Sequence, residues 1–187
     1  MNISDDPFSQ WVCDLLDISF ATTANADLRP TQKVATIAAN NTQLQQVNAA
    51  WGIKPHWAKK TLINAQAESV AEKPTFRHAF STYRCIVPCS GFYEWQTLAG
   101  GKQKWLFARE DGQPLFMAGI LYPTQTNTPQ LVTLTTKPNQ RFAGYHHRFP
   151  QFVHSQDIHS FLTGDADLAL KIMMDNDDRE IQANTAR

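Results

Sequence analysis

The sequence lacks three features that would place it in a specialised class of protein. Its 187 residues contain no apolar run near the roughly 20 residues that a membrane-spanning helix needs. The 17 Lys and Arg residues balance the 17 Asp and Glu residues, which argues against non-specific nucleic-acid binding over the whole surface but leaves room for a local basic or aromatic groove. Only three cysteines are present, and an odd number favours free thiols in a reducing compartment over a disulfide framework. We therefore expect a cytoplasmic globular protein with no membrane partner.

Several common chemical signatures are missing as well. There is no Gly-rich phosphate loop and no G-x-S-x-G nucleophile elbow. Asp5 and Asp6 stand where a signal peptide would be basic. Cys85 and Cys89 are four residues apart, but no second Cys/His pair has the spacing of metal ligands. We expect neither a metal nor a cofactor, and interpret the two cysteines as small apolar residues.

The apolar content that is present is sufficient for a core. Hydrophobic residues make up 42% of the chain and aromatic residues 11%, which excludes wholesale disorder. At roughly 150 residues per domain, the length favours one domain. We expect this domain to span residues 1–165, followed by a C-terminal helix and polar tail over residues 166–187.

Local patterns predict a mixture of helices and short strands. Phe8, Trp11, Val12, Leu15 and Leu16 share one helical face after Asp6-Pro7. Further helices are predicted after Lys73-Pro74, over Ser155–Leu162 and over Ala166–Met174. The predicted strands are Lys33–Asn40, Leu44–Trp51, Cys85–Val87, Gly91–Gln96, Lys104–Arg109, Leu115–Leu121 and Gln130–Thr135. This order indicates an α+β fold with an antiparallel, partly closed, open-barrel-like sheet and a few short helices.

Glu94 is the first candidate for chemistry. Strand alternation places it on one face with Phe92, and places Tyr93 and Trp95 on the other face. A carboxyl group among aromatic rings loses hydration, which raises its pKa toward the range useful for proton transfer at neutral pH. The alternative is an edge-strand glutamate whose carboxylate reaches water.

Three further polar residues could join it. His146 can exchange a proton near neutral pH, and Arg148 projects to the same side of an extended chain, as a phosphate-binding residue would. Asn64 could orient a substrate with its amide. Each also has a structural interpretation: a surface or core histidine, or an Asn that caps a turn.

Five segments together resemble the SOS-response-associated peptidase (SRAP) family of abasic-site processing proteins. They occur in the family's order and span roughly residues 1–165. The segments are Trp51-Gly52 with Pro55 and Trp57, Ile63–Glu68, Arg84-Cys85 with Gly91–Trp95, Thr135-Thr136, and His146–Pro150. The resemblance implies a single compact α+β domain, in agreement with the patterns above.

The resemblance also implies a chemistry. Members of the family capture abasic sites in single-stranded DNA with an N-terminal cysteine, whose amine and thiol form a thiazolidine with the ring-opened sugar aldehyde. An α-amine has a pKa of about 8, so part of it is unprotonated at neutral pH and can act as a nucleophile. By this resemblance Asn64, Glu94 and His146 are the catalytic residues: Glu94 shuttles protons, His146 promotes sugar ring-opening and Asn64 positions the N-terminus.

DNA contacts are implied for four residues: Trp51, Trp57, Thr135 and Arg148. The expected partner is single-stranded DNA that contains abasic sites, bound by a monomer that is nucleoid-associated when on DNA. The expected enzyme class is abasic-site cross-linking with linked lyase and self-processing peptidase activity. The alternative is a module that binds single-stranded or abasic DNA without covalent capture. A peptidase alone is less favoured, since no Ser/Cys–His–Asp pattern is visible.

The chain departs from the family pattern at three places. The family begins Met-Cys-Gly-Arg, whereas this chain begins Met1-Asn2, which is explained by a start codon placed late, by truncation or by loss of the nucleophile. Gln66 stands where the family has arginine, and His147 where it has aspartate. We expect a chain that begins at Met1 to be impaired in covalent capture.

Overall fold

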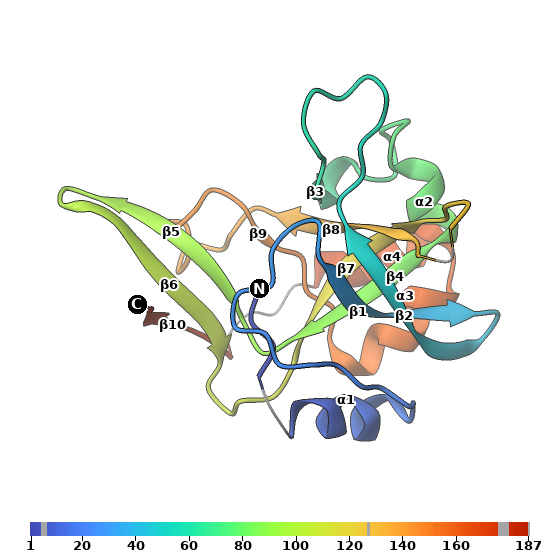
Figure 1. Ribbon diagram of the computed structural model, residues 1–187, viewed down its shortest axis with the longest axis horizontal. Coiled ribbons are helices and arrows are strands. Elements are labelled where there is room, and N and C mark those ends of the chain that lie inside the picture. Colours follow the sequence, from blue (N-terminus) through green and yellow to red (C-terminus); the bar gives the residue numbers. More distant parts are fainter. Residues whose placement is uncertain (5–6, 127, 176–179, 187) are drawn as a thin grey trace.

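Two β-sheets form the framework of the protein, as the computed structural model shows for residues 1–4, 7–126, 128–175 and 180–186 (Figure 1). The strands are β1 (Lys33–Asn40), β2 (Gln43–Trp51), β3 (Asn64–Gln66), β4 (Arg84–Cys89), β5 (Phe92–Leu98), β6 (Gly101–Arg109), β7 (Leu115–Tyr122), β8 (Gln130–Thr136), β9 (Phe149–Pro150) and β10 (Ile181–Thr185). The α-helices are α1 (Phe8–Leu16), α2 (Arg77–Thr82), α3 (Ile158–Thr163) and α4 (Ala166–Met174). Two short 3₁₀ turns cover Ala67–Ser69 and Ser155–Asp157.

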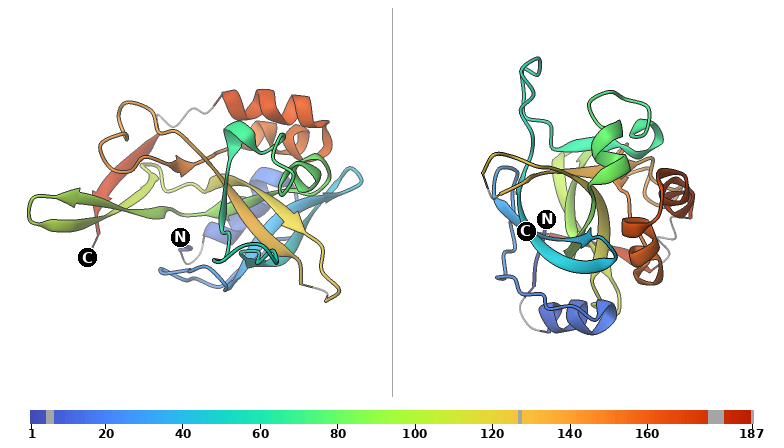
Figure 2. Two further views of the ribbon diagram at one scale, coloured as in Figure 1. Left: turned by 90° about the horizontal axis from the view of Figure 1, so that it is seen from above. Right: turned by 90° about the vertical axis from the view of Figure 1, so that its right-hand side faces the viewer.

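The larger sheet is curled. Its strands follow the order β2-β1-β4-β7-β8-β3, and β9 pairs with β8. Most neighbours are antiparallel, but β3 runs parallel to β8, and a short parallel pairing also joins β2 to β8. This second pairing brings one edge of the sheet back toward the other, so the strands curve around a common interior (Figure 2). The predicted α+β class with a partly closed sheet is confirmed.

The smaller sheet is a long β5–β6 hairpin joined by β10, and it projects away from the curled sheet (Figure 1). A cluster of phenylalanine rings fixes its base. Phe107 of β6 stacks on Phe92 of β5, with ring centroids 5.1 Å apart, and meets Phe149 of β9 edge to face at 4.9 Å. Because these rings are buried, they hold the hairpin at a fixed place beside β8 and β9.

A buried arginine connects two helices to the curled sheet. Arg84 at the start of β4 donates hydrogen bonds to the carbonyl groups of Phe80 and Ser81 at the end of α2. It also donates to Phe161 and Gly164 at the end of α3. One guanidinium thus satisfies carbonyl groups that both helices leave without an intrahelical partner.

The predicted elements agree closely with the structure, with a few differences. Helix α1 contains all the residues of the predicted apolar face. Asp6, its predicted cap, lies outside the described residues. Helix α2 begins at Arg77, later than the predicted start after Pro74. The segment expected to be a polar tail contains β10, which pairs with β6. No helix among the described residues has both the length and the apolar content to span a bilayer.

Candidate active site

A cavity of about 490 Å³ opens where the β5–β6 hairpin meets the end of β8 and the N-terminal segment. Six residues singled out from the sequence line it: Trp51, Asn64, Glu94, Thr135, His146 and Arg148. Four different parts of the chain supply them, namely β2, β3, β5 and the segment from β8 to β9. The remaining candidate, Trp57, is 58% exposed and does not line the cavity.

Glu94 lies in the cavity with its side chain only 20% exposed. Burial raises the pKa of its carboxyl group from 4.5 to about 7, although the positive charges of His146 and of the Met1 α-amine oppose this rise. The pairing of β5 with β6 places Glu94 opposite Trp105. Near neutral pH, Glu94 is therefore present in both protonation states and can give or take a proton.

His146 is the nearest titratable neighbour of Glu94. Its Nδ1 atom lies 3.5 Å from Glu94 Oε2 and 2.8 Å from the carbonyl oxygen of Arg148. The Arg148 amide nitrogen also lies 3.3 Å from Nδ1, but a carbonyl oxygen can only accept, so the shorter contact favours the tautomer with its hydrogen on Nδ1. In the neutral imidazole, the lone pair is then on Nε2, which is free to accept a proton.

Asn64 projects from β3 beside Thr133 of β8. The Thr133 hydroxyl lies 2.6 Å from Asn64 Oδ1 and 3.1 Å from the carbonyl of Ile63. That carbonyl already accepts hydrogen bonds from Trp51 Nε1 and from the Thr133 amide. Its two lone pairs are occupied, so the Thr133 hydroxyl donates to Asn64 Oδ1 and leaves the Asn64 NH₂ group for a ligand.

Arg148 is held by a carboxylate. Its NH1 and NH2 groups donate to the two oxygens of Glu68 at 2.9 and 2.7 Å, and the hydrogen bonds from Arg148 lower the pKa of Glu68 to about 2. Thr135 accepts from Arg148 through both its hydroxyl and its carbonyl group. These contacts use four of the five N–H groups of a guanidinium. Glu68 thus positions Arg148, and one N–H remains for a phosphate.

The N-terminal segment forms one wall of the cavity. The Met1 nitrogen donates to the Leu28 carbonyl at 3.1 Å, and the Leu28 amide donates to the Met1 carbonyl at 3.0 Å. The Asn2 amide donates to the Gly91 carbonyl at 2.8 Å. A side chain at Gly91 would meet the Phe107 carbonyl oxygen at 2.6 Å, so the close packing here requires glycine. Any residue joined to the nitrogen of Met1 would begin at this wall.

The tryptophans differ in what they offer a ligand. Trp51 is half-buried, and its indole N–H is bonded to Ile63. Trp95 lines the cavity and is 50% exposed. Trp57 lies on the loop between β2 and β3, which extends beyond the sheet in Figure 1. Stacking surface is thus available at Trp95 in the cavity and at Trp57 outside it.

Two of the positions that differ from the family pattern, Gln66 and His147, lie outside the cavity lining. His147 is exposed, with its ring centroid 4.4 Å from that of His146. Gln66 at the end of β3 is also exposed. Neither residue lines the cavity.

The cysteines lie apart from this chemistry. Cys85 and Cys89 are buried in β4, and burial raises the pKa of the Cys89 thiol to about 12. Cys13 on α1 is half-buried and donates through Sγ to the Phe20 carbonyl. Within residues 1–4, 7–126, 128–175 and 180–186, no three His, Cys, Asp or Glu side chains gather in a way that could hold a metal ion.

The structure adds lining residues that the sequence patterns did not indicate. These are Thr133, Lys104 of β6, and the pair Asp27 and Arg29 in the loop before β1. Strand parity places Lys104 with Trp95, on the other face of the hairpin from Glu94, so the alternation around Glu94 did not point to it. The loop residues carry no periodic signal.

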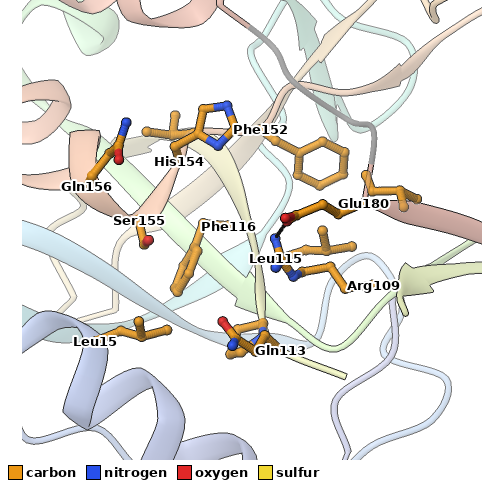
Figure 3. A pocket seen from close by; sticks show the side chains of 13 residues that line it. Leu15, Arg109, Gln113, Leu115, Phe116, Phe152, His154, Ser155, Gln156 and Glu180 are labelled. Atoms are coloured by element: carbon orange, nitrogen blue, oxygen red, sulfur yellow. Dashed lines mark ion pairs between the residues drawn. The ribbon is translucent and has the colours of Figure 1, made fainter. Parts of the chain in front are cut away.

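A second hollow, of about 210 Å³, lies between the end of α1, the start of β7 and the segment before α3 (Figure 3). Its cation, Arg109, is paired with the neighbouring Glu180 on the same side of the hollow and with Asp111. His154 and Gln156 line the opposite side in Figure 3. With its cation already neutralised by two carboxylates, this hollow offers less chemistry than the cavity at Glu94.

Comparison with known proteins agrees with the geometry. Residues 11–185 match the family model for "SOS response associated peptidase (SRAP)". The chain is 33% identical over 135 residues to the abasic site processing protein YoqW of Bacillus subtilis, covering 66% of this chain and 60% of that protein. It is 34% identical over 95 residues to YedK of Escherichia coli, also named an abasic site processing protein, covering 50% of this chain and 43% of that protein. The chain thus spans about 60% of the length of the first of these relatives.

The fold likeness extends over the whole chain. A crystal structure of a protein from Bordetella bronchiseptica superposes with a TM-score of 0.84 at 20% sequence identity, covering 100% of this chain and 98% of that one. At this identity the likeness concerns the fold alone.

Proposed function

Since the chain belongs to the SOS response associated peptidase (SRAP) family, we propose that it processes abasic sites in single-stranded DNA by covalent capture. The nucleophile would be an α-amino thiol supplied by a cysteine a few residues ahead of Met1. The observation that carries the proposal is the cavity: a desolvated glutamate, a histidine and an oriented amide converge beside the wall from which such residues would start.

The first step would open the sugar ring of the abasic nucleotide to give a free aldehyde. This requires a proton to leave the C1′ hydroxyl and another to reach the ring oxygen. His146, whose Nδ1 contacts the Arg148 carbonyl, would take the first proton on Nε2. The Asn64 NH₂ group, oriented by Thr133, would hydrogen-bond a sugar oxygen.

The second step would join the amine to the aldehyde. Attack gives a carbinolamine, which loses water to form an imine, and the thiol then adds to the imine carbon to close a thiazolidine ring. Glu94, with a pKa of about 7, can protonate the departing hydroxyl and then receive a proton from the thiol.

Two forms of the protein test the proposal: the chain as printed, and the same chain with Cys-Gly-Arg joined to Met1 behind a removable initiator. Each is incubated with a single-stranded oligonucleotide containing one abasic site, then separated on a denaturing gel. We expect a heat-stable adduct from the extended chain only. Within the extended chain, His146→Ala should slow capture by about 10²-fold, whereas His147→Ala is the matched control on the neighbouring exposed histidine.

Two results would contradict this proposal. A stable adduct formed by the printed chain without borohydride would show that the missing cysteine is not the nucleophile. An extended chain that binds the oligonucleotide but forms no adduct would support the alternative function, a module that binds DNA without covalent capture. The exposed indoles of Trp57 and Trp95 favour that alternative.

A further inference from the structure

Three cationic side chains line the cavity, and two of them are already paired. Arg29 forms an ion pair with Asp27, and Arg148 forms a two-pronged pair with Glu68. The third, Lys104, makes no ion pair with any residue that the structure describes. A phosphate entering the cavity would therefore meet at Lys104 a positive charge that no direct ion pair neutralises.

The Lys104 ammonium is also held in place. It lies 4.1 Å from the centroid of the Tyr93 ring, within the range of a cation–π contact. The contact restrains an otherwise flexible side chain, so less conformational entropy is lost when an anion binds. The ring takes no conventional hydrogen bond from the ammonium, so N–H groups of Lys104 remain to donate to an anion.

The neighbours of Lys104 suit a nucleotide. In the β5–β6 pairing, Lys104 lies directly opposite Trp95, so the two side chains share one face of the hairpin. Trp95 is half-exposed and lines the same cavity. An aromatic surface beside a cation is the combination with which proteins bind a base and its phosphate along a single strand.

We infer that Lys104 binds a backbone phosphate of the DNA strand next to the abasic nucleotide, with the adjoining base on Trp95. The inference rests on the proposed function, since it assumes that DNA enters this cavity. It assigns the leading phosphate contact in the cavity to Lys104, because four of the five N–H groups of Arg148 are already in use.

Lys104→Gln and Lys102→Gln give a matched pair of variants for the test. Both residues lie on β6 and both changes remove one positive charge, but Lys102 is exposed and lies outside the cavity lining. Binding of each variant to a single-stranded oligonucleotide is measured by fluorescence anisotropy over a series of salt concentrations. Thermal unfolding of each variant checks that the fold is unchanged.

We expect Lys104→Gln to weaken binding about fivefold at low salt and to reduce the slope of log K against log salt by about 0.7, the value for one phosphate contact on a single strand. Lys102→Gln should match the parent in slope, and Lys104→Arg should retain most of the parent slope. Equal slopes for Lys104→Gln and Lys102→Gln would overturn the inference.

The adduct assay separates this inference from the proposed function. If the extended chain forms an adduct while Lys104→Gln leaves the salt slope unchanged, the assignment of Lys104 alone is wrong. If the slope falls as expected but no adduct forms, Lys104 is a phosphate-binding residue and covalent capture is wrong. A chain that binds no single-stranded DNA would overturn both.

Discussion

Replacing Glu94 by glutamine should make the folded protein more stable at alkaline pH while slowing its chemistry. In the folded protein burial raises the pKa of Glu94 from 4.5 to about 7. Because one pKa unit corresponds to about 1.4 kcal/mol, ionising this carboxyl group in the folded state costs about 3 kcal/mol more than in the unfolded chain. Glutamine has a similar shape and carries no charge at any pH.

The sign of the pH dependence follows from proton binding. Between pH 4.5 and about 7, the folded state holds a proton on Glu94 that the unfolded state has released. The free energy of unfolding of the parent therefore falls as pH rises through this window, and the contribution of the bound proton is lost above it. At about pH 4 both states are protonated, so parent and Glu94→Gln should have similar stabilities.

Urea unfolding at a series of pH values measures this difference. The stability of Glu94→Gln relative to the parent should rise by up to about 3 kcal/mol between about pH 4 and about pH 8. Glu72→Gln, a change at an exposed glutamate away from the cavity, is the control and should show no such rise. A difference between Glu94→Gln and the parent that stays constant with pH would refute the claim that burial perturbs this carboxyl group. In the extended chain, Glu94→Gln should also slow adduct formation at least about tenfold.

Two further substitutions test the supports of the site. Thr133→Val should slow single-turnover capture about tenfold in the extended chain, because the Asn64 amide loses its orienting hydrogen bond. Thr133→Ser keeps the hydroxyl and should capture at the rate of the parent. A Thr133→Ser variant as slow as Thr133→Val would contradict this role. Arg84→Met should lower the free energy of unfolding by about 3 kcal/mol or more, because it leaves carbonyl groups of two helix ends unpaired. Arg84→Lys, which can satisfy fewer of these carbonyls, should fall between the parent and Arg84→Met in urea unfolding.

The parts of this protein that could be predicted from the sequence are those with a local cause. The strand Lys33–Asn40 has the predicted bounds because its β-prone residues end at an Asn-Asn turn. The alternation around Glu94 placed Tyr93 and Trp95 on one face, and the register of β5 and β6 agrees. Local patterns thus indicated the strand and offered a desolvated carboxyl group as one of two interpretations of Glu94.

The features that escaped prediction depend on long-range pairing. Strands β3 and β9 have three and two residues, too few for any periodic pattern to show. Thr133 meets Asn64 only because β3 runs parallel to β8, across 69 residues of sequence. Lys104 gained its significance because, among the described residues, it forms no direct ion pair, which no local pattern records.

The two glutamates near the cavity have opposite environments, and this difference assigns their roles. Glu68 accepts two hydrogen bonds from Arg148, which lower its pKa to about 2, so it stays ionised at neutral pH and serves to hold the guanidinium. Glu94 is largely buried, with its nearest titratable neighbour, His146, at 3.5 Å, and burial raises its pKa to about 7. Only a group whose two protonation states are both populated can act as acid in one step and base in the next. The proton transfers of an imine-forming reaction therefore fall to Glu94, while Glu68 stabilises the arginine beside it.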